Sequence, residues 1–324
     1  MLVSVLLFAV GLVLLIKGGD WFVDGATGIA KRFNLPDIVV GATVVSIGTT
    51  LPEVMVSTTG ALAGSGAMAY GNAIGSIICN TALIAAISIT CNPGPVNVKS
   101  MKTPAIFFFC SAAIYCLAAY GLGTFPRWLG FIMLAVFVCY MVLTVRNGMK
   151  NPDAAEEEEE EESKERKLWQ ELLLLVVGAA VIAVGADLLV DHGQIIAIGL
   201  GVPETVVALL FVALGTSLPE LVTTITSLKK GRASLGVGNV IGANVFNLVL
   251  VSGVAVSLAP FDVPVENTLL DTGLNLSLVF DIPVMLGVMS LMIFPALLKK
   301  KLGRWQGIVL LAIYAAFCVC QFML

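Results

Sequence analysis

The chain has 324 residues, of which 58% are hydrophobic and only 12% charged, and its mean hydropathy is +0.98. This composition excludes an ordinary water-soluble protein and indicates one that lies within a lipid bilayer. The formal net charge of −4 comes mainly from one acidic run. The single histidine and seven scattered cysteines argue against a zinc site and against a Ser-His-Asp triad. We expect neither an enzyme nor a bound cofactor or nucleic acid.

Apolar stretches with little or no charge recur along the chain. Each has about 20 residues, the length that crosses a hydrocarbon core of ~30 Å. We therefore predict an all-α membrane protein with ten transmembrane helices. In chain order the predicted spans are 2–28, 37–62, 68–90, 104–122, 128–146, 169–196, 204–228, 235–258, 275–298 and 305–323.

Three segments of the chain occur twice, at a constant offset of 167 residues. This period is far too long for a solenoid and indicates a duplicated domain. One segment is Gly-Thr-Thr-Leu-Pro-Glu in its first copy and Gly-Thr-Ser-Leu-Pro-Glu in its second. The three pairs are 48–53 with 215–220, 20–24 with 187–191, and 71–80 with 238–247.

A fourth match has an offset of 177, because residues 127–130 return at 304–307. Ten residues are therefore inserted in the second half, in the polar stretch around Asp262 to Asp271.

Each repeat holds five predicted spans, and a unit with an odd number of spans inserts its second copy upside down. We therefore predict two inverted-topology repeats. The first covers residues 1–148, an acidic cytoplasmic linker covers 149–167, and the second repeat covers 168–324.

The distribution of basic residues predicts the orientation of these spans. With the N-terminus outside, 16 of the 18 lysine and arginine residues fall in cytoplasmic connections, as the positive-inside rule requires. Arg127 falls in an outer connection and Lys17 within the first span. We therefore predict a multi-pass protein of the plasma membrane with both termini extracellular.

The Pro-Glu segments each place one carboxylate, Glu53 or Glu220, inside an apolar stretch. An ionisable residue at membrane depth is costly and by default indicates a functional site. A proline in a helix cannot donate to the carbonyl four residues before it, so each helix should kink there. We expect the kinks to free the carbonyls from Ser46 to Thr49 and from Ala213 to Thr216.

Freed carbonyls, carboxylates and hydroxyls are all hard oxygen ligands, which suit Ca²⁺, Na⁺ or Mg²⁺ and do not suit soft transition metals. The hydroxyls here belong to Thr49, Thr50, Thr216 and Ser217. The two segments therefore predict a cation site shared by the two repeats.

The Gly-Asn segments predict a second layer around this site. Ser76 and Asn80 are four residues apart and share one helix face, and Ala243 and Asn247 hold the matching positions. An asparagine amide can orient a glutamate or ligate a cation through its oxygen. The glycines have a spacing that lets helices approach closely, at Gly71, Gly75, Gly238 and Gly242.

These paired segments resemble the two α-repeats of the cation/calcium antiporter superfamily, and most closely its prokaryotic sodium/calcium exchanger branch. The resemblance extends over essentially the whole chain. It implies ten helices, eight of which form a bundle that holds the ions. The first and sixth spans would lie across this bundle as a sliding gate.

The resemblance also implies the roles of individual residues. Glu53 and Glu220 would bind Ca²⁺ together with the carbonyls of Thr49 and Thr216. The Na⁺ sites and their supporting shell would use Ser46, Thr50, Ser76, Ala213, Ser217, Asn80 and Asn247.

Two positions depart from the pattern of these exchangers, because Ala243 stands where serine is common and Asn247 where aspartate is common. A hydroxyl and an ionisable group are thus missing, which leaves the coupling ion open. We interpret the chain as a secondary antiporter that exports Ca²⁺ in exchange for Na⁺ by alternating access. The alternative is a calcium/proton antiporter. Stoichiometry and oligomeric state stay open, as does any use of K⁺.

Two rivals belong to other classes, a cation channel and an intramembrane aspartyl protease that would use Asp20 and Asp187. Two buried carboxylates with tight glycine packing favour an occluded site over a pore. Inverted repeats would place the aspartates toward opposite sides of the membrane. We expect them to reach the interface or to form ion pairs, for example with Lys17. The acidic run Glu156 to Glu162 indicates a solvated linker, with weak sensing of divalent cations as the alternative.

Overall fold

The computed structural model describes residues 2–150, 166–200, 215–264 and 275–323. The elements of the first half are α1 (Leu2–Arg32), α2 (Asp37–Val40), η1 (Gly41–Val45), α3 (Ser46–Thr49), α4 (Leu51–Leu62), α5 (Gly66–Cys79), η2 (Asn80–Ala85), α6 (Ala86–Cys91), β1 (Gly94–Pro95), α7 (Val98–Cys116), η3 (Leu117–Leu122), β2 (Thr124–Phe125) and α8 (Arg127–Met149). Those of the second half are α9 (Leu168–Gly199), α11 (Leu218–Lys229), α12 (Ala233–Phe246), η5 (Asn247–Val251), α13 (Ser252–Leu258), β3 (Phe261–Asp262), η6 (Ser277–Asp281), α14 (Ile282–Lys299), β4 (Lys301–Leu302) and α15 (Arg304–Met323). The elements named η are π-helical turns.

The described helices account for most of the predicted spans. Eight are long and apolar enough to cross a membrane, and a bent pair, Asp37–Thr49 with Leu51–Leu62, would make a ninth. These nine follow the predicted order. The remaining predicted span, 204–228, lies partly outside the described residues, which include α11 but not 201–214. The count of ten therefore stays a prediction.

The two halves of the chain fold into matching elements. The bounds of α4 and α5 return in α11 and α12 at the offset of 167, and β1 returns in β3 at the same offset. The elements β2 and α8 return in β4 and α15 at 177. The offset thus changes after β3, where the sequence predicts the ten-residue insertion.

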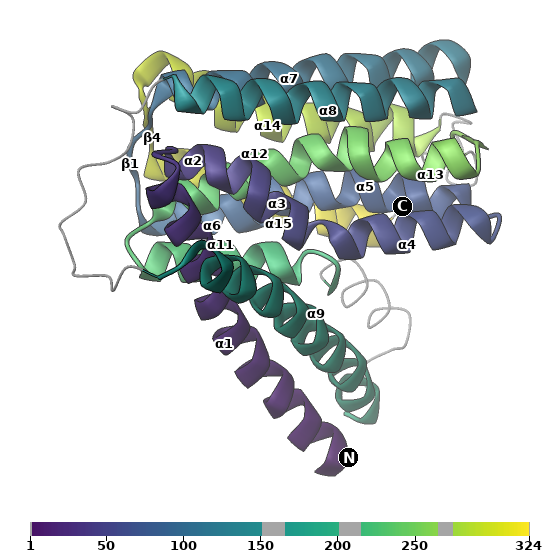
Figure 1. Cartoon of the computed structure of the whole chain (residues 1–324). Coiled ribbons are helices and arrows are strands. Elements are labelled where there is room, and N and C mark those ends of the chain that lie inside the picture. Colours follow the sequence, from purple (N-terminus) through teal and green to yellow (C-terminus); the bar gives the residue numbers. More distant parts are fainter. Residues whose placement is uncertain (1, 151–165, 201–214, 265–274, 324) are drawn as a thin grey trace.

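The equivalent helices α1 and α9 pack against each other over their length and form a layer beside the bundle (Figure 1). A Cβ added to Gly11 would lie 2.9 Å from the carbonyl oxygen of Gly185, and one added to Gly25 would lie 2.6 Å from that of Glu171. The numbering rises along α1 as it falls along α9, so the two helices run antiparallel. This direction is what inverted repeats require of their first helices.

Two short antiparallel sheets join the halves at the ends of the bundle. Gly94 and Pro95 of β1 pair with Leu302 and Lys301 of β4, and β2 pairs with β3. The helical segment Val98–Leu122 connects the first sheet to the second. Each sheet therefore joins two connections that the basic residues predict on one side of the membrane.

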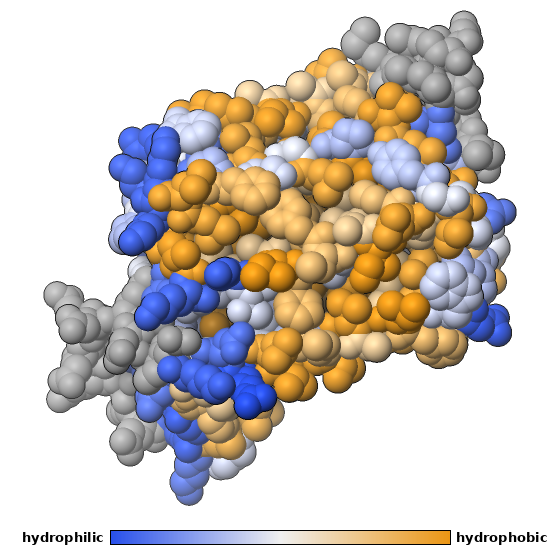
Figure 2. All heavy atoms as spheres, turned by 90° about the horizontal axis from the view of Figure 1, so that it is seen from above, coloured by the Kyte–Doolittle hydropathy of each residue, from blue (hydrophilic) through white to orange (hydrophobic). Residues whose placement is uncertain are grey.

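The outer surface is apolar between these ends. Figure 2 shows hydrophobic residues across the middle of one face and hydrophilic residues toward its two ends. Large apolar side chains are strongly exposed, among them Leu298 at 84%, Leu2 at 73% and Leu117 at 71%. Contiguous apolar surface of this extent is costly in water and is favourable against lipid.

The core lies around two central helical segments, Gly66–Cys91 and Ala233–Leu258. Their most apolar 18-residue stretches are 72% and 83% buried. Each is one span of its repeat, and each contains a π-helical turn that begins at an asparagine, Asn80 or Asn247. Turns of this kind are rare and frequently occur at functional sites.

Candidate functional site

The first Pro-Glu segment breaks its helix as predicted. Thr50 separates α3 from α4, and the two parts of the span meet at a bend of 46°. Pro52 lies in the first turn of α4 and has no N–H to donate to the carbonyl of Gly48. The expected release of the Ser46 carbonyl is wrong, because this carbonyl accepts a hydrogen bond from the Thr50 nitrogen at 3.0 Å.

The second copy has the same local geometry where it is described. Ser217 has φ −90° and ψ 3°, close to the −86° and 0° of Thr50, and α11 begins directly after it. Ala213 lies outside the described residues. Glu53 and Glu220 thus both lie in the first turn of a half-helix, where the positive end of the helix dipole favours negative charge.

The two carboxylates are fully buried. The Thr50 hydroxyl lies 3.4 Å from Oε1 of Glu220, as a hydrogen-bond donor from the other repeat. The remaining oxygens, Oε1 and Oε2 of Glu53 and Oε2 of Glu220, have no hydrogen-bond partner among the residues that the structure describes. Burying an ionised carboxylate without a partner is very costly, so these three oxygens require a cation or a proton.

The two asparagines at the π-helical turns, Asn80 and Asn247, extend this set of unpartnered groups. Both are fully buried, and in the part of the chain that the structure describes neither the oxygen nor the nitrogen of either amide has a hydrogen-bond partner. The turn η2, which begins at Asn80, contacts α11, and the turn η5, which begins at Asn247, contacts α4. Each asparagine thus belongs to a segment that packs against the glutamate helix of the opposite repeat.

The hydroxyl groups that the sequence predicts at the site are largely buried. Ser217 is buried with no partner for its Oγ, and Ser76 is buried on α5 one turn before Asn80. Ser46 donates to the carbonyls of Gly41 and Asn239 at 2.8 and 3.0 Å. Ala243, the counterpart of Ser76, is buried and apolar.

The threonines of the two segments bind residues that the prediction of site residues missed. The Thr49 hydroxyl donates to Oδ1 of Asn239 at 3.1 Å, and the Thr216 hydroxyl donates to Oδ1 of Asn72 at 3.4 Å. Asn72 and Asn239 occupy the same position in the two repeats, directly after Gly71 and Gly238. This repetition of a buried-span amide was the signal in the sequence that could have found them.

Close helix contact brings these groups together. A Cβ at Gly238 would collide with the carbonyl of Ile38, and one at Gly242 with the Ser46 hydroxyl. The predicted role of these glycines in helix packing is therefore confirmed. Among the described residues, nothing lies within 4 Å of a Cβ added at Gly71 or Gly75, so the same role stays a prediction for these two glycines.

The donors at this site are carboxylate, hydroxyl, amide and carbonyl oxygens. Across the described ranges, no three residues among His, Cys, Asp and Glu gather as a metal-binding group. The site therefore offers hard oxygen ligands with a total of two carboxylates, a set that fits Ca²⁺ or Na⁺ as transported substrate.

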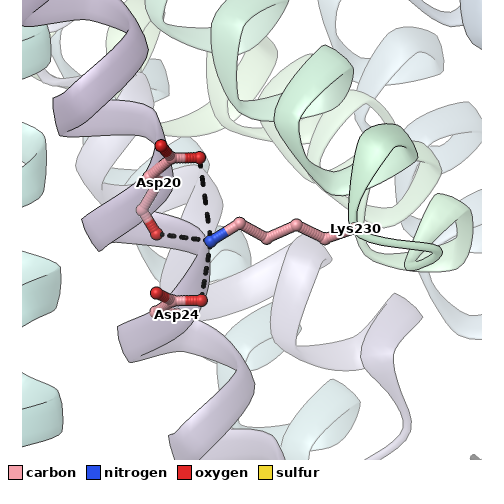
Figure 3. A network of polar contacts seen from close by, with 3 residues as sticks. All are labelled: Asp20, Asp24 and Lys230. Atoms are coloured by element: carbon pink, nitrogen blue, oxygen red, sulfur yellow. Dashed lines mark hydrogen bonds and ion pairs between the residues drawn. The ribbon is translucent and has the colours of Figure 1, made fainter.

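The aspartates of the first repeated segment lie elsewhere. Figure 3 shows Lys230, just after α11, reaching between Asp20 and Asp24 on α1. Its Nζ lies 2.7 Å from Oδ1 of Asp24, 3.0 Å from the Asp20 carbonyl and 3.8 Å from Oδ1 of Asp20. The expected ion pairing of Asp20 is confirmed, but its partner is Lys230 from the other half of the chain and not Lys17, which was the example given.

The register of α1 against α9 also excludes an aspartyl protease that would use Asp20 and Asp187. The contact of Gly11 with Gly185 sets the register of α1 and α9, so Asp187 lies opposite residue 9. That position is eleven residues from Asp20, or roughly 16 Å along a helix with a rise of ~1.5 Å per residue. The two carboxylates cannot share a proton or a water molecule at this distance.

Duplicated, oppositely directed helices around a buried oxygen site define a class of protein, the membrane transporters of small cations. A family model described as "Sodium/calcium exchanger protein" matches residues 3–146 and 171–323. The chain therefore belongs to the sodium/calcium exchanger family. It is a multi-pass membrane protein of the cation/calcium antiporter superfamily.

Individual relatives cover nearly the whole chain. An uncharacterized membrane protein of Methanocaldococcus jannaschii, MJ0091, is 34% identical over 95% of this chain and 94% of its own length. The sodium/calcium exchanger MaX1 of Methanosarcina acetivorans is 31% identical over 99% of each chain. A solved structure of the sodium-calcium exchanger NCX_Mj, soaked with Na⁺ and Sr²⁺, matches with a TM-score of 0.80 at 32% identity and covers 98% of each chain.

Proposed function

We propose that this protein exchanges Ca²⁺ for Na⁺ by alternating access, with Glu53 and Glu220 shared by the competing ions. One observation carries the proposal. Three carboxylate oxygens from the two repeats are fully buried and, within the described ranges, have no hydrogen-bond partner. Two carboxylates balance the charge of one Ca²⁺. Because Ca²⁺ and Na⁺ need the same oxygens, they cannot occupy the site together, and this competition couples their movements.

The neutral ligands follow the assignment that the family resemblance implies. The carbonyls of Thr49 and Thr216 complete the Ca²⁺ site. The Na⁺ sites and the surrounding shell use Ser46, Thr50, Ser76, Asn80, Ala213, Ser217 and Asn247. The unpartnered amides of Asn80 and Asn247 support this assignment, because a buried amide without partners is costly unless an ion or a bound water satisfies it.

Alternating access is the proposed role of the layer formed by α1 and α9. These two helices pack on each other through glycines. They are equivalent helices of the two repeats, and they run antiparallel. Movement of this layer across the bundle would open the site first to one side and then to the other. We further propose ten spans in inverted repeats, a plasma-membrane location and extracellular termini.

A calcium/proton antiporter is the second candidate, and the second repeat supports it. Ala243 offers no hydroxyl and Asn247 no ionisable group at positions that would otherwise serve Na⁺. Two protons could neutralise the two carboxylates as one Ca²⁺ does, whereas three Na⁺ would leave one excess positive charge.

Flux into vesicles separates these candidates. Purified protein is reconstituted, and uptake of ⁴⁵Ca²⁺ is measured under an outward gradient of Na⁺, K⁺ or H⁺. We expect uptake to follow the Na⁺ gradient and to stop in Glu53→Gln and Glu220→Gln. Asp281→Asn is the matched control, because Asp281 is a partly buried acid outside the site, and asparagine keeps the acceptor for Gln321. Uptake that follows only the H⁺ gradient would reject Na⁺ coupling, and an ohmic Ca²⁺ current would reject exchange altogether.

A further inference from the structure

Two hydrogen bonds cross between the repeats at equivalent positions. Thr49 of the first repeat donates to Asn239 of the second, and Thr216 of the second donates to Asn72 of the first. Each member of one bond is 167 residues from its counterpart in the other. The same contact is thus made in both repeats, and in each copy the threonine belongs to the segment that carries a buried glutamate.

The Asn72 amide uses both of its polar ends. Its Nδ2 donates to the Glu53 carbonyl at 3.2 Å and to the Ser57 hydroxyl at 2.8 Å. Its Oδ1 accepts from Thr216. One side chain therefore joins the backbone of one glutamate segment to the threonine of the other.

Asn239 makes the corresponding contact from a fully buried position. Its Oδ1 accepts from Thr49 at 3.1 Å, and the Ser46 hydroxyl lies 3.3 Å from the same oxygen. The acceptors that match those of Asn72 are the Glu220 carbonyl and the hydroxyl of Thr224. Both Nδ2 of Asn239 and Oγ1 of Thr224 are buried and have no hydrogen-bond partner among the described residues, so these groups are available for this second bond.

An amide suits this position for two chemical reasons. It supplies a donor and an acceptor from one short side chain, which no carboxylate or hydroxyl does in the same geometry. It is also neutral. A neutral link therefore holds the glutamate segments without changing the charge that they offer to the ions.

We propose that Asn72 and Asn239 are positioning residues that fix the two glutamate segments relative to each other for ion binding. The proposal deepens the exchange function proposed above and rests on it. Without either hydrogen bond, the two glutamate segments are less ordered before the ion binds. Ordering them on binding costs free energy, and this cost weakens ion binding. Under the proposed mechanism the maximal rate depends on movement of α1 and α9. Among the described residues, these amides make no hydrogen bond to either helix.

The loss of one such hydrogen bond should raise the Ca²⁺ concentration for half-maximal exchange by roughly five-fold. The maximal rate should change by less than about two-fold. The test compares Thr49→Val, which removes the hydroxyl but keeps its shape, with Thr49→Ser, which keeps the hydroxyl donor. Asn239→Leu and the double variant Thr49→Val with Asn239→Leu complete a cycle. All are measured as Na⁺-driven Ca²⁺ uptake into vesicles, with thermal unfolding as the check on folding.

The control variant is Asn244→Leu on the same helix. Asn244 is fully buried and also bonds across the repeats, to the Thr81 hydroxyl at 2.7 Å, but Thr81 is not in a glutamate segment. We expect this variant to lower stability and to leave the half-maximal Ca²⁺ concentration unchanged. It therefore separates a general packing defect from a defect of ion binding.

Support would consist of a raised half-maximal concentration in Thr49→Val and Asn239→Leu, no further rise in the double variant, and recovery in Thr49→Ser. Normal Ca²⁺ dependence in Thr49→Val would overturn the proposal, even if Asn239→Leu failed to fold. Equal defects in Thr49→Ser and Thr49→Val, additive effects in the double variant, or the same shift in Asn244→Leu would overturn it too. Absence of exchange by the unmodified protein would instead overturn the proposed function.

Discussion

Glu53→Gln should abolish Ca²⁺ binding without destabilising the empty protein. Both carboxylate oxygens of Glu53 are buried and have no hydrogen-bond partner in the described part of the chain, so the change to an isosteric amide breaks no side-chain hydrogen bond there. We therefore expect the ion-free variant to be at least as stable as the ion-free parent, to within the ~1 kcal/mol of one hydrogen bond.

The parent and Glu53→Gln should differ in how much Ca²⁺ raises the free energy of unfolding. A ligand that binds only the folded state stabilises it by about 2.7 kcal/mol at 100 times its Kd. Thermal unfolding in detergent, titrated with Ca²⁺ in the absence of Na⁺, should show this stabilisation in the parent and in Asp281→Asn, and none in Glu53→Gln. A Ca²⁺-dependent shift of normal size in Glu53→Gln, or a marked loss of stability without ions, would refute the reasoning and make Glu53 a structural residue.

Three further predictions concern the linker, the topology and the coupling ion. Deletion of residues 156–162 should leave Ca²⁺ uptake within about two-fold of the parent if the run is a solvated linker; a larger loss of apparent affinity for cytoplasmic Ca²⁺ would show regulation. Single cysteines labelled by an impermeant reagent should react from the inside at Lys99 and Lys229 and from the outside at Thr124 and Asp262. Opposite sides for Lys99 and Lys229 would contradict the ten-span count. Ala243→Ser with Asn247→Asp should steepen the Na⁺ dependence of uptake, since it adds a hydroxyl and a charge; increased pH sensitivity without better Na⁺ binding would show that the new carboxylate stays protonated.

Much of the fold could be predicted because its signals are local. Runs of apolar residues identify the spans by length alone, and nine of the ten predicted spans correspond to described helices or to the bent pair. The kink at Thr50 follows from the missing N–H of Pro52, which acts within one helical turn. The burial of Glu53 and Glu220 follows from their apolar surroundings in the sequence.

The hydrogen bonding of one π-helical turn, η1, depends in part on a distant partner that the local sequence could not predict. In η1 the carbonyl of Ala42 accepts a hydrogen bond from the Tyr140 hydroxyl at 2.7 Å, although the two residues are almost a hundred positions apart. A turn of this kind leaves backbone groups unpaired unless another helix supplies a donor. The sequence near Ala42 carries no sign of Tyr140.

Pairings between the repeats were missed for the same reason. Lys17 is close to Asp20 in sequence, but the partner of Asp20 and Asp24 is Lys230, which the packing of α11 on α1 brings to them. The site residues Asn72 and Asn239 were visible as repeated asparagines, but their bonds to Thr216 and Thr49 depend on how the two halves meet. The local sequence shows which residues are present, but it does not show which residues of the other repeat they bind.

Because the architecture is duplicated, some contacts are made in both repeats and others in only one. These two kinds of contact have different consequences. A contact made in both repeats, such as Thr49 with Asn239 and Thr216 with Asn72, is preserved when the halves exchange roles, so it cannot favour one direction of opening. A contact made once can. Lys230 binds α1 at the end of α11, whereas its equivalent position in the first repeat is Ala63, which cannot hold α9 in the same way. Partly exposed ion pairs contribute about 0–1 kcal/mol, enough to shift a balance between two states by up to roughly five-fold. Under the proposed alternating access, we expect this unmatched ion pair to make the two end states unequal in energy, although the ion site between them is built from matching parts.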